Sequence, residues 1–572
     1  MEGRSIVTSA SPREAPLLPR TARMRLTDRV MTRMLDLPPA TTDYSVRRNV
    51  PVLMRDGVVL RADHYVPRTS TPAGTLLLRC PYGRGAPLSW LYSRVYAQRG
   101  YHVVFQSVRG TFGSGGEFEP GGYEVEDGAD TVAWLRCEPW FTGTFATLGQ
   151  SYLGFTQWAV LADPPPELVT AVITVGPHDS KSLVARNGGL ALSNVLWWCD
   201  QVAHQEDSGA ARRMLRQFTS ERGVRAAADC LPLGRSGRDL LGAGAPWYEA
   251  LLEHSDFNDD YWRRADVEAA PDRTNVPVLL IGGWQDLFLG QTLEQYRRLQ
   301  ANGAHPALHV GPWTHLEMLG KAAGAIARET LPWLATHLAG TGSADRSPVR
   351  IFVNGGPGWR DLPDWPPASQ LRTLYLNAGA VLAAQPPADD VAPSRFTYDP
   401  AAPTPTIGGP FLSARKAGYQ DDSALSFRGD VISFTTTPLT NDWEVIGAPT
   451  VELQHSADNP HADIFVRLSE VDPKGRSRNV TEGYLRRTDD KKPLRFTLDA
   501  IAHRFRVGTR IRLVIAGGSH PHYGRNLGTG EPPLIAFAMK PCNHVIAHGS
   551  GGTSCLHLPV VSPAAKSEET SS

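Results

Sequence analysis

The sequence predicts an α/β protein with a mainly parallel sheet, a helical insertion within that sheet domain and an all-β domain towards the carboxyl end. Short apolar runs alternate with segments of helical spacing at first, a helical and aromatic stretch then breaks the pattern, and short strands between turn-rich segments follow Pro348. The expected parts are an arm without fixed structure (1–44), an α/β domain (45–180 and 273–342), a helical cap (181–272), a jelly-roll β-sandwich (348–560) and a disordered tail (561–572).

The α/β domain begins with an expected hairpin around the turn at 55–57. Apolar runs typical of strands buried on both faces follow, at 75–79, 101–105, 144–149, 168–175, 276–284 and 306–313. Helical spacing occurs between them, at 88–100, 127–136, 152–162 and 292–300, and a last helix is expected at 326–340. Strands that alternate with helices predict parallel pairing.

Beyond Pro348 the expected strands are short and lie between turns, which is typical of a sandwich or jelly roll. They are expected at 349–355, 371–377, 430–436, 450–456, 462–471, 494–500 and 509–517.

Composition excludes several function classes. Lys+Arg and Asp+Glu are both 58, so the net charge is zero and favours neither nucleic acid nor an anionic membrane as a partner. There is no apolar run of about 18 residues, and the first residues lack the apolar core of a secretory signal. The six cysteines show no C-x-x-C spacing, which indicates free thiols in a reducing compartment. We therefore expect a cytoplasmic protein.

The segment GQSYLG at 149–154 is the first candidate for chemistry, because it nearly matches the G-x-S-x-G turn that presents a nucleophilic serine. Ser151 follows one predicted strand, Asp286 a later one and His315 the next. This order, with each residue just beyond a strand, is what a Ser–Asp–His triad on a parallel sheet requires. A serine hydroxyl needs a neighbouring imidazole to remove its proton, and a carboxylate to orient that imidazole.

Each of these residues also has a structural interpretation. A serine beside two glycines is a weak signal by itself, and Asp286 is also placed to cap the following helix. His305 and His309 compete with His315, but the first precedes its strand and the second alternates within it. The combination of order, strand context and cap favours the catalytic interpretation.

An oxyanion hole needs two donors. The backbone N–H of Tyr152, directly after the serine, is the expected first donor. The loop CPYGRG at 80–85 contains no glycine run for the second, but it does contain the hydroxyl of Tyr82. On chemistry alone, a packing role for this tyrosine is favoured.

At this point the chain resembles the cocaine esterase and X-prolyl dipeptidyl-peptidase group of α/β-hydrolases, from about residue 45 to 560. The matching segments are PYGRG (81–85), VRGTFGSGGEF (108–118), EDGADTVAWL (126–135), GQSYLGFTQW (149–158), GGWQDLF (282–288) and GPWTH (311–315). The family elbow is G-x-S-Y-x-G, so the late glycine is the expected form.

The resemblance implies an α/β-hydrolase fold with an inserted helical cap and a C-terminal jelly roll. It gives the triad roles to Ser151, Asp286 and His315, and it assigns an oxyanion donor to the Tyr82 hydroxyl beside the N–H of Tyr152. One departure is Ser107, where the family has the aspartate of Asp-x-Arg-Gly. A serine cannot form the same ion pair with an arginine, which puts the rigidity of that loop in question.

The function expected is a serine hydrolase that cleaves an acyl ester or amide through an acyl-enzyme, with an esterase favoured over an X-Pro dipeptidyl-peptidase. A peptidase must hold a free ammonium group, and the cap offers Asp200, Glu206 and Asp207 for it. We expect a small ester or short peptide as substrate, no cofactor and no metal; a homodimer stays open.

Two other classes were weighed against this function. The first is a non-catalytic protein that binds a ligand through its β-sandwich. The second is a metal site formed by four histidines near the carboxyl end, which lack diagnostic spacing and are expected to be exposed in loops. They are His520, His522, His544 and His548.

Overall fold

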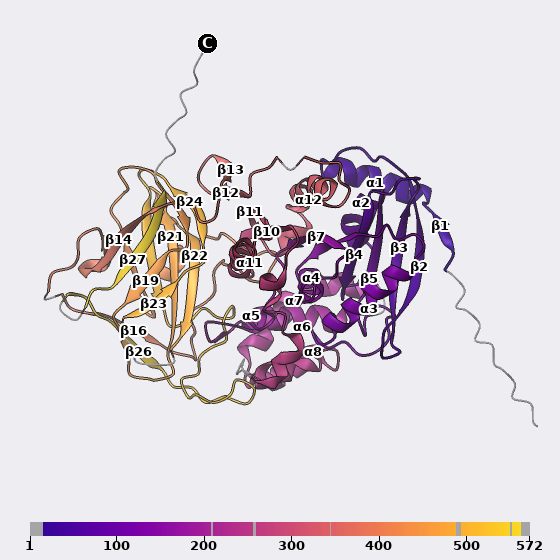
Figure 1. The fold of residues 1–572 in the computed structure, drawn as a ribbon. Helices are drawn as coiled ribbons and strands as arrows, with labels where there is room; N and C mark the ends of the chain where they lie inside the picture. Colours follow the sequence, from indigo (N-terminus) through magenta and orange to yellow (C-terminus); the bar gives the residue numbers. More distant parts are fainter. Residues whose placement is uncertain are drawn as a thin grey trace, which may run out of the picture.

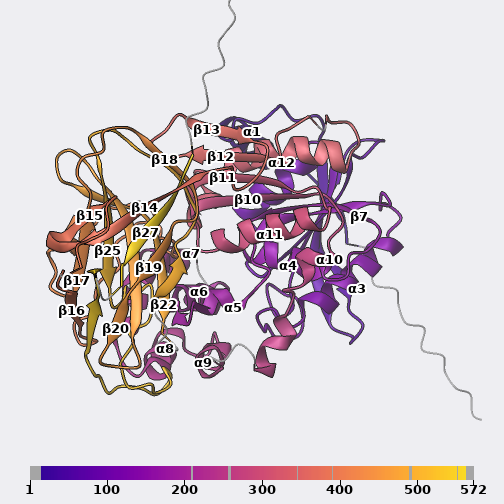
Figure 2. The same cartoon turned by 60° about the vertical axis from the view of Figure 1, so that its left-hand side comes forward.

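The structure is a computed structural model of the whole chain, shown as a ribbon in Figure 1. It describes residues 15–207, 210–254, 259–343, 345–389, 391–487, 493–549 and 552–561. An α/β domain and a β domain lie side by side, and the helical cap lies against both (Figures 1 and 2). The expected tail at 561–572 lies outside the described residues except for its first residue.

The α/β domain is built on a twisted, mostly parallel sheet with the strand order β1-β2-β3-β5-β4-β6-β7-β10-β11-β12-β13. Its strands are β1 (Leu17–Pro19), β2 (Tyr44–Leu53), β3 (Val59–Pro67), β4 (Gly74–Cys80), β5 (Tyr101–Ser107), β6 (Phe145–Gln150), β7 (Leu168–Thr174), β10 (Val278–Gln285), β11 (Ala307–Thr314), β12 (Val349–Val353) and β13 (Gly358–Leu362). Strands β4, β5, β6, β7, β10, β11 and β12 pair in parallel. For the first six of them the apolar runs predict this pairing.

Helices cover both faces of this sheet, and two hydrophobic cores result. One core lies under α3, α4 and α11, and the other lies under α1, η1, α2 and α12. The helices are α1 (Ala22–Met34), η1 (Trp90–Arg94), α2 (Val95–Ala97), α3 (Glu124–Cys137), α4 (Tyr152–Leu161), α11 (Leu289–Ala301), η3 (Leu316–Leu319) and α12 (Ala323–His337). The helix expected at 88–100 is thus a π-turn followed by one short α-turn.

The first 44 residues differ from the expected arm. Residues 1–14 lie outside the described residues, but β1 pairs with β2, and helix α1 packs against the domain. Asp28 of α1 is buried and forms ion pairs with Arg20 and Arg94. The charges scattered through this segment suggested a solvated chain, whereas several of them pair with each other inside the fold.

The cap is helical as expected, and it joins the α/β domain between β7 and β10. It consists of α5 (Lys181–Val184), the short hairpin β8 (Ala185–Arg186) and β9 (Gly189–Leu190), α6 (Leu192–His204), α7 (Ala210–Asp229), α8 (Leu233–Leu241), α9 (Trp247–Glu253), η2 (Asp260–Ala265) and α10 (Ala270–Arg273). Its own core contains aromatic side chains of α6 and α9 together with Tyr152 of the α/β domain. In the part of the chain that the structure describes, no helix combines the length and apolarity needed to cross a membrane.

The boundary after the last α/β helix differs from the expectation. Strands β12 and β13 follow Pro348 but extend the first sheet, β12 pairing in parallel with β11 and β13 antiparallel with β12. Val349, Ile351 and Val353 are buried in the α/β core. A short alternating strand does not reveal which sheet it joins, so the sequence assigned this segment to the second domain.

The β domain then contains a large, strongly curved sheet and a small three-stranded one. Its strands are β14 (Gln370–Asn377), β15 (Val381–Ala383), β16 (Ser394–Tyr398), β17 (Val431–Thr435), β18 (Trp443–Gly447), β19 (Thr450–Leu453), β20 (His455–Ala457), β21 (Asp463–Val471), β22 (Ser477–Arg486), β23 (Leu494–Thr497), β24 (Ile501–Phe505), β25 (Arg510–Ala516), β26 (Cys542–Ile546) and β27 (Cys555–Val561); two short 3-10 turns are η4 (Ala378–Ala380) and η5 (Ser423–Phe427). Alternating apolar residues of these strands enclose one core.

Candidate active site

Ser151 lies at a sharp turn between β6 and α4. Its backbone has φ 56° and ψ −122°, a combination that is unfavourable for a residue with a side chain. Hydrogen bonds hold the turn: the Ser151 N–H donates to the Thr174 carbonyl at 3.0 Å, and the Ser151 carbonyl accepts from the N–H groups of Gly154 and Phe155. Such a turn lifts a serine hydroxyl above the end of the sheet.

The two glycines that flank Ser151 are required by close contacts. Gly149 has φ 154°, and a Cβ there would lie 2.4 Å from the Leu153 Cβ. At Gly154 a Cβ would lie 2.4 Å from the Cα of Gly176, which follows β7. The late glycine of GQSYLG therefore lets helix α4 pass directly over the end of the neighbouring strand.

The strand ends bring the other two predicted residues to Ser151. Asp286 follows β10 and His315 follows β11, and these strands are parallel neighbours. The Nδ1 of His315 lies 2.6 Å from the Asp286 Oδ2, and its Nε2 lies 2.9 Å from the Ser151 Oγ. The other oxygen of Asp286 accepts a hydrogen bond from the Phe288 N–H at 2.7 Å.

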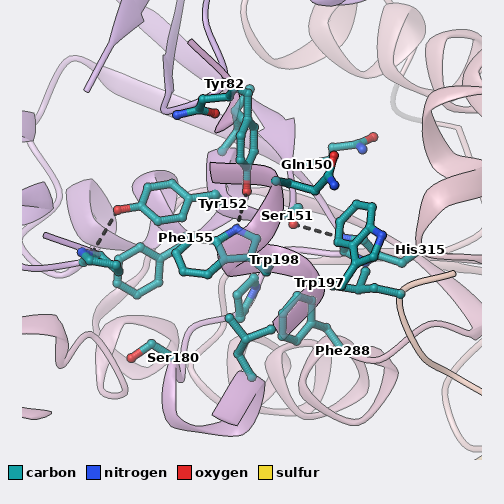
Figure 3. Close-up of a pocket in the computed structure, with 18 of the residues that line it drawn as sticks. Tyr82, Gln150, Ser151, Tyr152, Phe155, Ser180, Trp197, Trp198, Phe288 and His315 are labelled. Carbon is teal, nitrogen blue, oxygen red and sulfur yellow. Dashed lines mark hydrogen bonds between the residues drawn. The ribbon is translucent and has the colours of Figure 1, made fainter. Parts of the chain in front are cut away.

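This chain of hydrogen bonds has one direction. With Asp286 bonded to Nδ1, the Nε2 of His315 is free to accept the proton of the Ser151 hydroxyl. Both Asp286 and His315 are buried, which shields their interaction from water. Figure 3 shows Ser151 and His315 joined at the pocket.

Tyr82 and Tyr152 lie on the other side of Ser151. The Tyr152 N–H begins helix α4, so it has no acceptor within the helix, while the Tyr152 hydroxyl donates to Glu124 at 2.9 Å and accepts from the Gly121 N–H. The Tyr82 hydroxyl accepts a hydrogen bond from the indole N–H of Trp198 at 3.0 Å (Figure 3).

The Trp198 bond determines the direction of the Tyr82 proton. An indole N–H can only donate, so the Tyr82 oxygen is the acceptor and its own proton is left to donate elsewhere. Burial raises the pKa of the Tyr82 hydroxyl, while hydrogen bonds with Trp198 and Ser151 lower it less. The phenol therefore stays protonated, and its proton is free for an acceptor other than the Trp198 indole.

The site opens into a pocket of about 870 Å³ between the α/β domain and the cap. Aromatic side chains dominate its walls, among them Phe155 of α4, Trp197 and Trp198 of α6, and Phe288 (Figure 3). Leu412 of the β domain also lines it, and the Leu412 N–H donates to Asn194 of α6. All three parts of the chain thus shape one mostly apolar cavity, which is typical of a small-molecule site.

The acidic residues of this pocket are already engaged. Asp200 accepts a hydrogen bond from Ser220 at 2.6 Å, Glu206 accepts one from the Phe112 N–H, and Glu119 lies 3.5 Å from Arg264. Asp207 is bonded to His204 at 3.1 Å on the exposed side of the cap.

The loop that begins at Ser107 is held although the expected aspartate is absent. Arg84 donates to the Ser107 hydroxyl, and its charge lies 3.4 Å from Asp63. Arg109 forms a bidentate pair with Asp127, at 2.6 and 3.1 Å. Asp63 thus pairs with Arg84 and Asp127 with Arg109, so other carboxylates supply the negative charge that Ser107 lacks.

The histidines set aside in the sequence fall outside the site in different ways. His309 is buried within β11, and burial lowers its pKa to about 3. The expectation that His520, His522, His544 and His548 are exposed is wrong, because each is at most 3% exposed. They have separate partners, namely Asp229, Glu482, His455 and Ser394.

Sequence reasoning missed three residues that surround the site. Trp198 orients Tyr82, Glu124 holds the Tyr152 ring, and Arg79 pairs with Glu124 at 2.9 Å. The WW pair at 197–198 in a helix of an otherwise polar cap was the available signal for the first. No local pattern marks the other two.

A parallel sheet with a strained serine, an imidazole and a carboxylate at successive strand ends defines the arrangement of a serine hydrolase of the α/β-hydrolase fold. Residues 56–317 match the family model described as X-Pro dipeptidyl-peptidase (S15 family), and residues 341–557 match that of the X-Pro dipeptidyl-peptidase C-terminal non-catalytic domain. The cocaine esterase of Rhodococcus sp. is 30% identical over 575 residues, covering 91% of this chain and 99% of the relative. A putative serine esterase of Mycobacterium tuberculosis is 25% identical over 626 residues, covering 90% and 95%.

The chain belongs to the cocaine esterase and X-Pro dipeptidyl-peptidase (CocE/NonD) family and is a serine hydrolase that acts on ester or amide bonds. Solved structures share the whole fold. An α-amino acid ester hydrolase is 24% identical with a TM-score of 0.76, covering 92% of this chain and 98% of that one. An aminopeptidase from a marine sediment Thaumarchaeota archaeon is 22% identical with a TM-score of 0.77 and the same coverage.

Proposed function

We propose that this protein is a carboxylesterase in which Ser151, His315 and Asp286 form the catalytic triad. The observation that carries the proposal is the continuous set of hydrogen bonds from Asp286 through His315 to Ser151, at 2.6 and 2.9 Å, at the bottom of an apolar pocket. In acylation, His315 takes the Ser151 proton while the oxygen attacks the ester carbonyl. The same proton is then given to the leaving alcohol, and an acyl-enzyme remains.

The oxyanion formed in this step accepts hydrogen bonds from the Tyr152 N–H and the Tyr82 hydroxyl. The bond from Trp198 and the high pKa of the Tyr82 phenol support this role, because they keep the phenol protonated and leave its proton free for an acceptor other than the indole. In deacylation, water attacks the acyl carbon, His315 takes its proton, and the proton returns to the Ser151 oxygen as the acid leaves.

An ester is favoured over an X-Pro peptide because the walls of the pocket are mostly apolar. A peptidase of that kind must bind a free ammonium group, whose desolvation requires an ionised partner. Glu119 is paired with Arg264, whereas Asp200 and Glu206 accept hydrogen bonds from the uncharged Ser220 hydroxyl and Phe112 N–H and are the groups that an ammonium would have to reach. The X-Pro dipeptidyl-peptidase alternative is supported by the match to the S15 family model.

The test is a panel of p-nitrophenyl acyl esters against the p-nitroanilides of Ala-Pro and Gly-Pro, run with wild type and Ser151→Ala. We expect turnover of the esters, with aromatic acyl groups included, and its loss in the variant. Higher kcat/KM for the p-nitroanilides would replace the esterase with the dipeptidyl-peptidase. Ester turnover that survives in Ser151→Ala would remove the triad assignment.

Three further statements about the protein in the cell remain proposals. All six cysteines are free in the structure, which supports a reducing compartment, the cytoplasm. The zero net charge supports the absence of a nucleic-acid or membrane partner. A homodimer is tested by the molar mass in light scattering after size exclusion.

A further inference from the structure

A cluster of three unlike ligand groups lies on the β domain, away from the active-site pocket. Glu452 of β19, together with Cys555 and His557 of β27, places a carboxylate oxygen, a thiol sulfur and an imidazole nitrogen within 4.8 Å of one another. Strands β14, β27 and β19 lie side by side in the β domain in both ribbon views (Figures 1 and 2).

Strand register explains why these residues meet. Glu452 is directly opposite Cys555, and His557 is two residues further along the same strand, so all three side chains project from one face. The alternate residues, such as Leu453 and Leu556, point the other way into the core of the domain. The cluster therefore lies on the outer face of the sheet, where a metal ion can arrive from solvent.

The contacts converge on a single nitrogen. The His557 Nε2 lies 3.4 Å from the Cys555 sulfur and 3.2 Å from a Glu452 oxygen, while its Nδ1 lies 2.9 Å from the Thr373 hydroxyl. One ring nitrogen has one in-plane direction, so it cannot form good hydrogen bonds with both partners at once. A cation at the common point would serve all three groups together.

The two separations from the His557 nitrogen fit a tetrahedral zinc ion. Zn–S and Zn–N bonds of about 2.3 and 2.05 Å at a tetrahedral angle place sulfur and nitrogen about 3.5 Å apart, and nitrogen and oxygen about 3.4 Å apart. The observed separations are 3.4 and 3.2 Å. Thr373, opposite His557 on β14, fixes the ring through Nδ1, as partners of metal-bound histidines commonly do.

Two of the three ligand residues are partly exposed to solvent, and an arginine competes with a cation for Glu452. Cys555 is 5% exposed, and the side chains of His557 and Glu452 are 18% and 20% exposed. Arg495, across from Glu452 on β23, pairs with the same carboxylate oxygen at 2.7 Å and is 64% exposed. This guanidinium has to move aside into solvent before the oxygen can coordinate a cation.

We propose that Glu452, Cys555 and His557 bind one Zn²⁺, with water as the fourth ligand, and that the ion fastens the C-terminal strand β27 to β19. A thiolate and an imidazole favour zinc over magnesium or calcium, which prefer oxygen ligands. On binding, the thiol proton passes to solvent and the sulfur coordinates as thiolate, so no redox partner is involved.

The experiment uses the full chain, stripped with a chelator under a thiol-free reductant and titrated with Co²⁺ as a spectroscopic substitute for zinc. We expect one equivalent to bind with a thiolate-to-cobalt charge-transfer absorption, and added Zn²⁺ to displace it. Cys555→Ser should remove that absorption, and His557→Gln should weaken binding at least about tenfold. The matched control is Cys542→Ser, another buried cysteine of the same domain, which should bind as wild type does.

Arg495→Gln tests the proposal by an expected gain of metal affinity instead of a loss. Removing the competing guanidinium should tighten binding, and Zn²⁺ should raise the Tm of this variant and of wild type but not that of Cys555→Ser. Ester turnover should be the same in all these variants, because none lines the active-site pocket. A wild-type titration without the thiolate absorption, or equal affinity in Cys555→Ser, His557→Gln and wild type, would overturn the proposal.

Discussion

Two buried histidine–carboxylate pairs, one in each domain, have nearly the same local form. In the α/β domain the His315 Nδ1 lies 2.6 Å from Asp286, and in the β domain the His522 Nδ1 lies 3.2 Å from Glu482. All four residues are at most 6% exposed. Burial and pairing therefore do not by themselves distinguish a catalytic histidine from a structural one.

The partners on the far sides of each pair distinguish them. Glu482 is also bonded to Arg467 at 2.5 Å, and the His522 ring packs against Phe411 and Tyr523. The buried arginine balances the charge of the Glu482 carboxylate, and the partners on both sides of the pair leave no side that faces the active-site pocket. Besides His315, the Asp286 carboxylate accepts a hydrogen bond from the uncharged backbone N–H of Phe288. His315 presents its second ring nitrogen to Ser151 at the active-site pocket.

We infer from this difference that a histidine with an open second nitrogen is available for proton transfer, whereas a carboxylate neutralised by an arginine contributes to stability. Substitutions in the His315–Asp286 pair should lower kcat and leave the stability of the fold unchanged. Substitutions in the His522–Glu482 pair should lower the stability and leave kcat unchanged. The following changes test this contrast, from the largest expected effect to the smallest.

Ser151→Ala should lower kcat by about 10⁴-fold or more, because the attacking oxygen is removed while the His315–Asp286 pair stays intact. The readouts are ester turnover and covalent labelling by a fluorophosphonate, followed by intact mass. Ser180→Ala is the matched control, since that serine lines the same pocket. A phosphonyl adduct on Ser151→Ala would contradict the nucleophile assignment.

Asp286→Asn should lower kcat by about 10⁴-fold with little change in Tm, because an amide stabilises the wrong imidazole tautomer and no imidazolium. Kinetics and thermal melting are measured on the same samples. Asp179→Asn is the control, because Asp179 lies near the pocket but bonds the Lys181 N–H instead of a histidine. Near-normal turnover in Asp286→Asn would require another acid.

Glu482→Gln should lower the free energy of unfolding by about 3 kcal/mol and leave kcat nearly unchanged, because it removes the carboxylate bonded to the buried Arg467 guanidinium and leaves that charge with Asp422, 3.8 Å away. Glu470→Gln is the control: Glu470 also pairs with a histidine, His503 at 3.0 Å, but it is 23% exposed, so a loss below about 1 kcal/mol is expected.

The same variant has a pH signature. Burial by itself raises the pKa of the Glu482 carboxyl. Arg467 and His522 lower it by more than burial raises it, so the pKa is about 2 against a usual value of 4.5. A depressed carboxyl pKa means that the stabilisation is fully present above about pH 4.5 and is lost as the pH falls towards 2. The stability difference between wild type and Glu482→Gln should therefore shrink over that interval, and a constant difference would refute the ionised pair.

Tyr82→Phe should lower kcat by about 10²–10³-fold and change KM much less, because the missing hydroxyl donates mainly in the transition state. Tyr92→Phe, another buried tyrosine of the pocket wall, is the control. If Tyr82 only packs, its phenylalanine variant will be silent in turnover and Tyr82→Ala will lower the Tm.

Trp198→Phe should lower kcat by about fivefold, the value of one neutral hydrogen bond, because it frees the Tyr82 hydroxyl to turn away from Ser151. Trp197→Phe, the neighbouring indole of the same pocket, controls for a change in ring size. In a Tyr82→Phe background the Trp198→Phe effect on kcat should disappear. Additive effects on kcat would mean that Trp198 acts independently of Tyr82.

Much of the fold was predictable because its signals are local. Apolar runs predicted the parallel strands, and glycines at fixed spacing predicted the turn at Ser151, since both follow from residue types a few positions apart. Strands β12 and β13 were assigned to the wrong sheet, because a strand's sequence shows its alternation and not its neighbour. The segment around Asp28 was expected to be solvated for a similar reason: one of its arginine partners, Arg94, lies on η1, 66 residues further along the chain.

The sequence by itself determined the residue types of the candidate site and their order along the chain, because each residue lies directly after a strand that its own apolar run predicts. Only the tertiary structure decided that the Tyr82 proton is free for an acceptor other than Trp198, because the indole that donates to the Tyr82 oxygen belongs to a residue 116 positions away on the cap. Only the structure showed that Glu482, the partner of His522, is also paired with Arg467 and that Cys555 and His557 meet Glu452, because cross-strand register and domain packing join residues that no local pattern connects.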